Sequence, residues 1–494
     1  MGITYRKSTT QEMFFLTFPK SNLFLRSDVK TIEGWRWRPE ITSWTVPSSL
    51  RTIKELDSLG FTPKGAETTD YISMIRELET GAHRLGDALC YELDVAGKTL
   101  WPYQLAGYKF FKKRKTGLLY DAVGVGKTLQ GIAWAKDEDN ILVICPKIVI
   151  SQWRDLLDTE GRKDAVVINY EQLHKLENVT HNTALIVDEA HLIKNTKTER
   201  HKRVIKVSKK VRKVLALTGT PLVNRPIDLW AIYLLCGMRE PNQFWSWAMA
   251  YTGAYKAEFG WNFSGATNLD LLKEDMLHWS LRRELEEVWE DMPETTTLRL
   301  EIESEEKEER VDYDSRILGL LNGGISLHSA EGIGEIQSLR QATARAKVPF
   351  LREWIKNHLD SGGRGVAVFA SFKQPLYDLC SPFEGQYITG DIGEQEREKA
   401  KSDFGNGFCK VIGLTYGAGG VGLDNLQYGA DTVILLDLPW TPTEYEQAIA
   451  RVRRRGMQGP LQVIIPVVDS VIEKFIADGL DRKQSAFTYL KEVL

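Results

Sequence analysis

Residues 118–128, with the sequence Leu-Leu-Tyr-Asp-Ala-Val-Gly-Val-Gly-Lys-Thr, have the types and spacing of a phosphate-binding loop. A short apolar run leads into a turn with Gly124 and Gly126, and Lys127 and Thr128 open a segment with helical character. The glycines let the backbone curl so that successive N–H groups point at anionic oxygens, and the helix N-terminus adds further donors. Lys127 would reach the β- and γ-phosphates of a nucleotide, and the Thr128 hydroxyl would bind Mg²⁺.

One residue of this stretch departs from the general pattern G-x-x-x-x-G-K-[ST]. The position of the first glycine is occupied by Asp121. Taken alone, the stretch could therefore also be a glycine-rich strand-to-helix turn with an incidental lysine. The rest of the chain has to decide between the two interpretations.

Two carboxylates follow a second apolar run, in which residues 184–187 lead directly into Asp188 and Glu189. Sheets of α/β proteins place their sites at the carboxyl ends of the strands. Asp188 would hold Mg²⁺ directly or through water, and Glu189 would orient and polarise an attacking water molecule. The alternative is a strand that ends in a charged turn. Thr218 and Thr220 follow another apolar run and either sense a γ-phosphate or cap a turn.

Two arginines lie far along the chain in the basic segment 447–455. Arg451 and Arg454 are three residues apart, a spacing that places them on one face of a helix. Such a pair suits an arginine finger that is supplied to a nucleotide across a domain cleft. The alternative is a basic helix face that binds nucleic acid or has no ligand.

The elements that would position these residues are short apolar runs separated by helical segments. This pattern is typical of parallel sheets covered on both faces, so the fold class is predicted to be α/β. The first set of runs comprises 141–145, 165–168, 184–187 and 214–217, and the second comprises 366–372, 411–415, 432–437 and 461–465. We predict one domain at 93–295 with a helical insertion at about 222–290, and another at 296–494 with a helical insertion at about 305–360.

Residues 1–92 are predicted to form a separate α+β accessory module. Runs at 14–18, 23–25, 35–39 and 42–46 are interpreted as short strands, and a helix is expected from about residue 48 to Gly60. Aromatic residues alternate here with Lys30, Arg36 and Arg38. They either stack on bases and hold phosphate groups or pack inside a small domain.

The composition is that of a globular protein with several domains. The chain has 494 residues, of which 43% are hydrophobic and 27% charged, and its net charge is −3. A nucleic-acid surface must therefore be local, for example on the basic stretch 194–213, which is otherwise a solvated helix face. No apolar run has the length of a membrane span, and five scattered cysteines suggest buried free thiols. These features predict a cytoplasmic protein that does not associate with membranes.

The ordered set of motifs resembles the SNF2 branch of the superfamily 2 helicase-type ATPases. Asp121 is a mark of that family, as are Lys194-Asn195 and the run Leu281-Arg282-Arg283. The family's last motif continues as Arg-Ile-Gly-Gln, whereas this chain has Arg454-Arg455-Gly456-Met457. The matching segments, in the family's order, are 103–104, 121–128, 146–153, 188–191, 217–221, 418–423 and 447–454.

The resemblance implies two RecA-like lobes that use ATP and Mg²⁺ and bind DNA. It implies a DNA-dependent ATPase that moves on double-stranded or branched DNA, in a compact bacterial or phage type of protein, with an N-terminal module similar to that of annealing helicases. A strand-separating helicase and a nucleotide-gated DNA-binding protein are the alternatives. The implied roles are adenine recognition by Gln104, phosphate and Mg²⁺ binding by Gly124, Val125, Gly126, Lys127 and Thr128, water activation by Asp188 and Glu189, coupling to DNA by Thr218, Thr220, Gly420, Gly422 and Asp424, and finger roles for Arg451 and Arg454.

Overall fold

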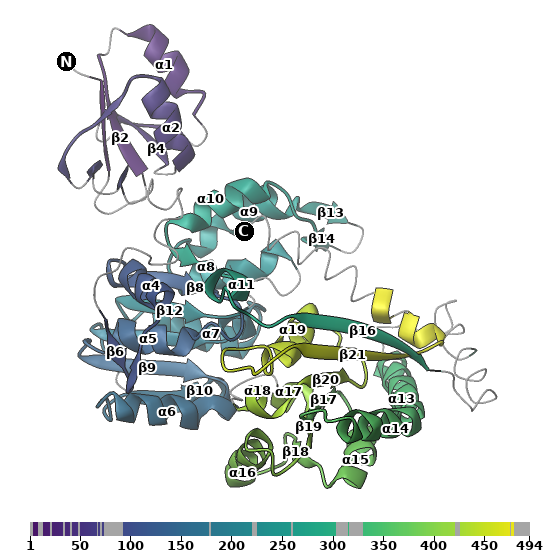
Figure 1. Ribbon diagram of the computed structural model, residues 1–494. Coiled ribbons are helices and arrows are strands. Elements are labelled where there is room, and N and C mark those ends of the chain that lie inside the picture. The colour runs from purple at the N-terminus through teal and green to yellow at the C-terminus, as the bar shows by residue number, and fades with distance from the viewer. Residues whose placement is uncertain are drawn as a thin grey trace.

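The computed structural model describes most of the chain, and all statements below concern this part. The described residues are 3–7, 13–19, 22–32, 35–39, 42–47, 50–66, 68–69, 72–73, 92–176, 179–219, 225–257, 260–302, 315, 330–419, 425–474 and 476–478. Two sheets of parallel strands, each covered by helices, form two lobes that lie against each other (Figure 1).

The first lobe, lobe 1, is built on a six-stranded sheet in which all pairs are parallel. Its strands, in spatial order, are β10 (Val166–Asn169), β9 (Asn140–Cys145), β11 (Thr183–Asp188), β12 (Lys213–Leu217), β8 (Thr116–Leu119) and β15 (Ser280–Leu281). The central strands are apolar and fully buried because helices cover both faces. These helices are α4 (Pro102–Lys112), α5 (Lys127–Ala135), α6 (Ile150–Thr159) and α7 (Glu199–Ser208).

The strand register brings the predicted site together at one edge of this sheet. Leu217 of β12 pairs with both Leu119 of β8 and Asp188 of β11, so these three strands end level with one another. The phosphate loop after β8, Glu189 after β11 and Thr218 after β12 therefore leave the sheet side by side.

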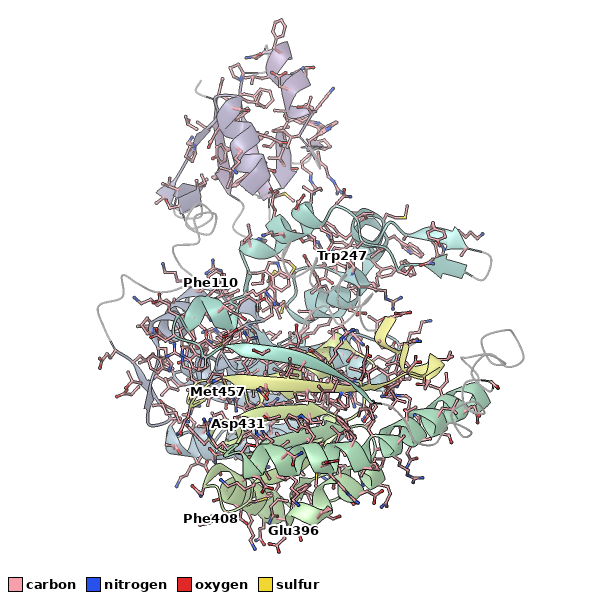
Figure 2. The ribbon with its side chains drawn as sticks, turned by 45° about the vertical axis from the view of Figure 1, so that its right-hand side comes forward. Phe110, Trp247, Glu396, Phe408, Asp431 and Met457 are labelled. Carbon is pink, nitrogen blue, oxygen red and sulfur yellow. The ribbon has the colours of Figure 1, made fainter. Side chains whose placement is uncertain are left out.

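The second lobe, lobe 2, has its own six-stranded parallel sheet. Its strands, in spatial order, are β16 (Thr295–Ile302), β21 (Leu461–Val468), β20 (Thr432–Leu435), β17 (Val366–Ala370), β19 (Val411–Thr415) and β18 (Gln386–Ile388). Its helices are α13 (Ala330–Ala346), α14 (Val348–Asp360), α15 (Lys373–Cys380), α16 (Glu394–Gly405), α17 (Tyr416–Gly419), α18 (Leu426–Gly429) and α19 (Pro442–Ala450). Asp431 and Met457 lie at this sheet (Figure 2).

The segment between β12 and β15 is the predicted insertion. It contains α8 (Trp230–Leu235), α9 (Phe244–Thr252) and α10 (Leu269–Leu277), while α11 (Leu285–Val288) follows β15. The prediction of an all-helical insertion is incomplete, because β13 (Tyr255–Ala257) and β14 (Gly260–Asn262) form a hairpin and β15 joins the sheet of lobe 1. Trp247 is buried within the insertion (Figure 2).

The N-terminal module is an α+β unit with a five-stranded sheet. Its elements are β1 (Thr4–Lys7), β2 (Met13–Thr17), α1 (Leu23–Val29), β3 (Arg36–Arg38), β4 (Ser43–Pro47), α2 (Leu50–Ser58) and β5 (Thr62–Pro63). The predicted strand at 23–25 is wrong. The side chain of Asn22 accepts a hydrogen bond from the N–H of Leu25 at 3.1 Å and caps a helix instead, in which Leu25 and Val29 share the buried face.

The aromatic residues of this module mainly contact one another. The rings of Trp35 and Trp37 lie 5.2 and 5.5 Å from that of Trp44, and Lys30 lies 5.8 Å from the ring of Trp35. This is closer to the interior-packing interpretation, although Trp37 remains 41% exposed. The cysteines at 145, 236, 380 and 409 are buried and free, and among the described residues no helix has the length and apolar character that crossing a bilayer requires.

Candidate nucleotide site between the two lobes

The loop between β8 and α5 has the backbone shape that its glycines predict. Gly124 and Gly126 have φ angles of +93° and +88°, a region that favours glycine. The ammonium group of Lys127 donates hydrogen bonds to the carbonyl oxygens of Asp121 at 2.7 Å and Ala122 at 3.1 Å. Burial lowers the pKa of Lys127, while the charge of Glu189 opposes that effect. The side chain of Lys127 therefore folds back over the loop. Thr128 follows it in the first turn of α5.

Gln104 joins the start of α4 to this loop. Its side-chain amide donates to the carbonyl of Val125 at 3.1 Å, and its side-chain oxygen accepts a bond from the N–H of Trp101 at 3.1 Å. A side chain at Gly126 would collide with the same amide, which explains the need for glycine there. Adenine recognition by Gln104 remains a prediction, and only one of its N–H groups is left for it.

Asp121, the residue that departs from the general pattern, is the centre of a buried ionic network. Its carboxylate is fully buried against Arg283, with Nε and Nη2 of the arginine 3.0 and 2.5 Å from its two oxygens. Arg283 also donates to Gln130 at 2.6 Å and to the carbonyl of Tyr103. The network ties the phosphate loop to α4, α5 and the segment after β15. A glycine at position 121 would leave Arg283 without its counter-ion.

Asp188 and Glu189 lie at the end of β11 as predicted. The indole N–H of Trp153 donates to one oxygen of Asp188 at 2.8 Å, and the N–H of Glu189 donates to the other at 3.0 Å. Burial, together with the charge of Glu189, raises the pKa of Asp188 to about 6. The pKa of Glu189 is lowered although burial acts to raise it, because His191 and the positive charges of Lys127 and Arg451 outweigh burial.

His191 connects this acidic pair to Thr218. Its Nδ1 lies 2.9 Å from the hydroxyl of Thr218 and 3.2 Å from a carboxylate oxygen of Glu189. Nδ1 of His191 can form its hydrogen bond with only one of these two partners at a time. The contact between the ends of β11 and β12 can therefore switch between Thr218 and Glu189. The other predicted coupling residues lie outside the described residues, namely Thr220, Gly420, Gly422 and Asp424.

Arg451 and Arg454 lie at the phosphate loop, but not on one helix face. The helix α19 ends at Ala450, and Arg454 sits in a turn that its N–H closes on the carbonyl of Val452 at 2.9 Å. The helical prediction failed because the chain has to turn back towards β21, and the buried Val452 and Met457 anchor that turn. Arg451 is buried near enough to Lys127 and Glu189 for its charge to lower the pKa of both.

The rest of the same turn makes further contacts across the cleft. A side chain at Gly124 would approach Cβ of Arg454 to 3.6 Å, so this part of lobe 2 lies directly against the phosphate loop. Arg453 forms an ion pair with Glu286 at 2.5 Å. Arg455 donates to the carbonyl of Val288 at 2.5 Å, and its guanidinium lies 3.9 Å from the ring centre of Trp101. The two lobes are thus closed around the loop.

The geometry fits a magnesium ion that is completed by phosphate oxygens. Among the described residues there is no group of three or more His, Cys, Asp or Glu side chains that could hold a metal alone. Magnesium in nucleotide sites is typically bound by one or two carboxylates together with substrate phosphates and water. Asp188, whose pKa is raised by burial and by the neighbouring Glu189, is a carboxylate that a cation would stabilise, and Thr128 lies in the first turn of α5 after the phosphate loop.

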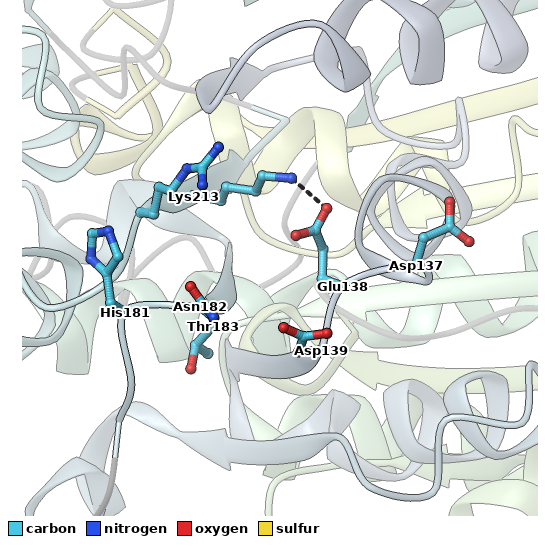
Figure 3. A pocket seen from close by; sticks show the side chains of 8 residues that line it. Asp137, Glu138, Asp139, His181, Asn182, Thr183 and Lys213 are labelled. Atoms are coloured by element: carbon cyan, nitrogen blue, oxygen red, sulfur yellow. Dashed lines mark hydrogen bonds and ion pairs between the residues drawn. The ribbon is translucent and has the colours of Figure 1, made fainter.

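A separate hollow of about 230 Å³ lies at the opposite edge of the lobe 1 sheet, where β9, β11 and β12 begin (Figure 3). Lys213 pairs there with Glu138. Three consecutive acidic residues, 137–139, line it together with Arg212 and Lys213, and it lies at the opposite ends of the strands from the phosphate loop. The candidate site is therefore the one at the carboxyl ends of the strands.

Sequence reasoning gave no role to several residues that organise this site. Trp153 and Arg283 belong to segments named as family marks, but nothing local predicted that they would contact Asp188 and Asp121. Gln130 and Tyr103 are part of the same network. The contact of Arg455 with Trp101 joins residues far apart in the sequence, and only the departure from the family's last motif pointed to position 455.

Comparisons with known proteins agree with this architecture. The SNF2-related domain matches residues 157–343, and the helicase conserved C-terminal domain matches residues 346–456. Together these two matches cover more than half of the chain.

Among curated proteins, the chain is 25% identical over 427 residues to the Xenopus laevis SWI/SNF-related matrix-associated actin-dependent regulator of chromatin subfamily A-like protein 1, covering 78% of this chain and 43% of that protein. It is 25% identical over 434 residues to the mouse DNA annealing helicase and endonuclease ZRANB3, covering 78% and 40%. The chain thus spans less than half the length of these relatives.

Among solved structures, the Sulfolobus solfataricus SWI2/SNF2 ATPase core in complex with dsDNA matches at 26% identity and a TM-score of 0.36, covering 78% of this chain and 91% of that one. The first domain match begins after the phosphate loop and extends through β16 into α13 of lobe 2, and the second lies within lobe 2. This chain therefore belongs to the SNF2 family of superfamily 2 helicase-like proteins.

Proposed function

We propose that this chain is a DNA-stimulated ATPase of the SNF2 type that couples ATP hydrolysis to movement on double-stranded or branched DNA. The observation that carries the proposal is the composite site between the lobes. Lys127 and the carboxylates of Asp188 and Glu189 come from lobe 1, whereas Arg451 and Arg454 come from lobe 2. Hydrolysis at such a site requires both lobes, so it is coupled to their relative motion.

Each residue has a distinct role in the proposed reaction. The N–H groups of the loop around Gly124 and Gly126 hold the phosphates, and Lys127 leaves the carbonyls of its own loop to bind the γ-phosphate. Thr128 and Asp188 would hold Mg²⁺, which would supply positive charge to the phosphate oxygens. Glu189, whose pKa is lowered chiefly by His191 against the effect of burial, stays ionised and orients the attacking water.

The arginines of lobe 2 make turnover depend on closure. An arginine finger increases the rate of hydrolysis about 10³- to 10⁵-fold when it contacts the transferred phosphoryl group. DNA that spans both lobes favours the closed arrangement and thereby stimulates hydrolysis. Binding through phosphate contacts should weaken steeply as the salt concentration rises. Two of the relatives are named DNA annealing helicase and endonuclease, which supports DNA as the substrate in this proposal.

The proposal is tested by measuring phosphate release from ATP with duplex, single-stranded, forked and four-way DNA. We expect stimulation by DNA that contains duplex and none in Lys127→Ala, which should still bind duplex DNA. DNA-stimulated turnover that survives in Lys127→Ala would show that this site is not the ATPase site. Absence of any turnover in the unaltered protein would favour a nucleotide-gated binding protein, and displacement of strands from a fully paired fork would favour a helicase.

A further inference from the structure

The carboxylate of Asp188 is held from two directions by groups of the chain itself. The indole N–H of Trp153 donates to Oδ2 at 2.8 Å, and the N–H of Glu189 donates to Oδ1 at 3.0 Å. The hydroxyl of Tyr170 donates to the backbone carbonyl of Asp188 at 2.5 Å. With one bond on each oxygen, the carboxylate plane cannot rotate freely, yet each oxygen keeps a lone pair for another partner.

Trp153 is a rigid donor because its ring is enclosed on all sides. The residue lies on α6 and is only 1% exposed. A side chain at Gly131 of α5 would come within 3.4 Å of the far end of the indole. The ring therefore fills the space between the helix that follows the phosphate loop and the end of β11. Packing fixes the direction of its N–H, so the bond to Asp188 costs little further side-chain entropy.

An indole is chemically suited to support a metal-binding carboxylate. Its N–H is a donor only, and it carries no charge, so it orients an anionic oxygen without competing with a cation for it. A lysine or arginine in the same place would neutralise the carboxylate and weaken its attraction for a metal. Partners of this kind outside the metal's own ligands typically change metal affinity by about 10–100-fold when they are removed.

We infer that Trp153 is a positioning residue that aims the carboxylate of Asp188 at Mg²⁺ and thereby sets the metal affinity of the nucleotide site. This inference rests on the proposed function, because it takes Asp188 as the magnesium ligand. It adds that α6, through one hydrogen bond from Trp153, determines how well the site holds its metal.

The test is Trp153→Phe, which keeps an aromatic ring between α5 and β11 and removes the N–H. The affinity for a fluorescent ADP analogue is measured by titration of the full chain with Mg²⁺ and again in EDTA. We expect the Mg²⁺-dependent gain in affinity to fall by about 10–100-fold in Trp153→Phe, while the affinity in EDTA stays unchanged. The matched control is Trp279→Phe, because Trp279 is equally buried and donates to the carbonyl of Asp275 at 3.0 Å, away from Asp188.

The outcomes separate this inference from the proposed function. If the unaltered protein binds the ADP analogue equally well with Mg²⁺ and EDTA, the assignment of Asp188 as a metal ligand fails, and the inference fails with it. If the unaltered protein depends on Mg²⁺ and Trp153→Phe has the same dependence, the inference alone is overturned. Equal losses in Trp153→Phe and Trp279→Phe would also overturn it, because they would indicate a general packing effect.

Discussion

Replacing Asp121 by glycine should damage this protein, although glycine is what the general phosphate-loop pattern prescribes at that position. The reason lies in Arg283, which is fully buried and has Asp121 as its counter-ion. Asp121→Gly removes both carboxylate bonds from a buried guanidinium that also donates to Gln130 and to the carbonyl of Tyr103. The variant that matches the general motif more closely is therefore expected to be less stable than the unaltered protein.

The size of the effect follows from what the substitution leaves behind. Removal of one partner from a buried ion pair costs about 3–5 kcal/mol, because the other charge stays desolvated and unpaired. The added backbone freedom of glycine contributes about 0.4–1 kcal/mol, which Asp121→Ala would avoid. For a domain of the size of lobe 1, each 1 kcal/mol shifts the melting temperature by about 2–4 °C. We therefore expect a loss of roughly 7–24 °C.

Thermal unfolding followed by circular dichroism measures this loss, and a second substitution identifies its cause. Asp121→Leu combined with Arg283→Met removes both charges and should recover most of the stability, because a buried ion pair can be replaced by apolar residues at little cost. Asp137→Gly is the control, because its ion pair with Lys112 is exposed and worth less than about 1 kcal/mol. The reasoning is refuted if Asp121→Gly melts within 2 °C of Asp137→Gly, a margin of about 1 kcal/mol or less.

Three further predictions concern the same site. Gly107→Ala would push a methyl group into the amide of Gln130 and should cost about 1–3 kcal/mol in thermal unfolding, whereas Gly334→Ala, with open space around it, should be neutral or stabilising. Burial raises the pKa of Asp188 to about 6, so this carboxyl group stabilises the metal-free protein below about pH 4 and loses that contribution as the pH rises through 6. The pH dependence of unfolding should therefore differ between the unaltered protein and Asp188→Asn within this window, and added Mg²⁺ should offset the loss. Arg455→Ile should reduce the ratio of closed to open molecules about 2- to 30-fold, from the 0.5–2 kcal/mol of a cation–π contact. Energy transfer between dyes on the two lobes measures this ratio, and an unchanged transfer efficiency would contradict the prediction.

Much of the fold was predictable because its strands are short, mostly apolar runs whose ends carry the chemistry. The runs before Asp121 and Asp188 indicated buried parallel strands, and the carboxyl ends of such strands meet at one edge of a sheet. The positions of Lys127, Asp188 and Glu189 followed from that rule alone. Their proximity did not require knowledge of any distant contact.

The failures have a common physical origin in interactions that local patterns do not contain. The apolar run 23–25 has the composition of a strand, but the side chain of Asn22 caps a helix there. The spacing of Arg451 and Arg454 fits a helix face, yet the burial of Val452 and Met457 turns the chain after Ala450. In each case a bond or a buried side chain outside the periodic pattern decided the conformation.

The contact partners of the site lie still further from local pattern. Asp121 and Arg283 are separated by 162 positions, and no periodicity relates them. A buried carboxylate needs a hydrogen-bonded or charged partner, but the sequence alone did not show that Asp121 is buried. That requirement does not identify which of the many arginines supplies it. Only the return of the chain through β15 to the edge of β8 selects Arg283.

The departure from the family's last motif at Arg455 is understandable from the same geometry. The family's isoleucine could only pack at this point, whereas the guanidinium of Arg455 lies 3.9 Å from the ring centre of Trp101 and donates to the carbonyl of Val288. Trp101 also gives its backbone N–H to Gln104, which holds the phosphate loop through Val125. One residue of lobe 2 is thereby linked, through an aromatic ring and an amide, to the loop that would hold the phosphates. Arg455 thus adds to the contacts between the lobes at a residue, Trp101, that also contacts Gln104.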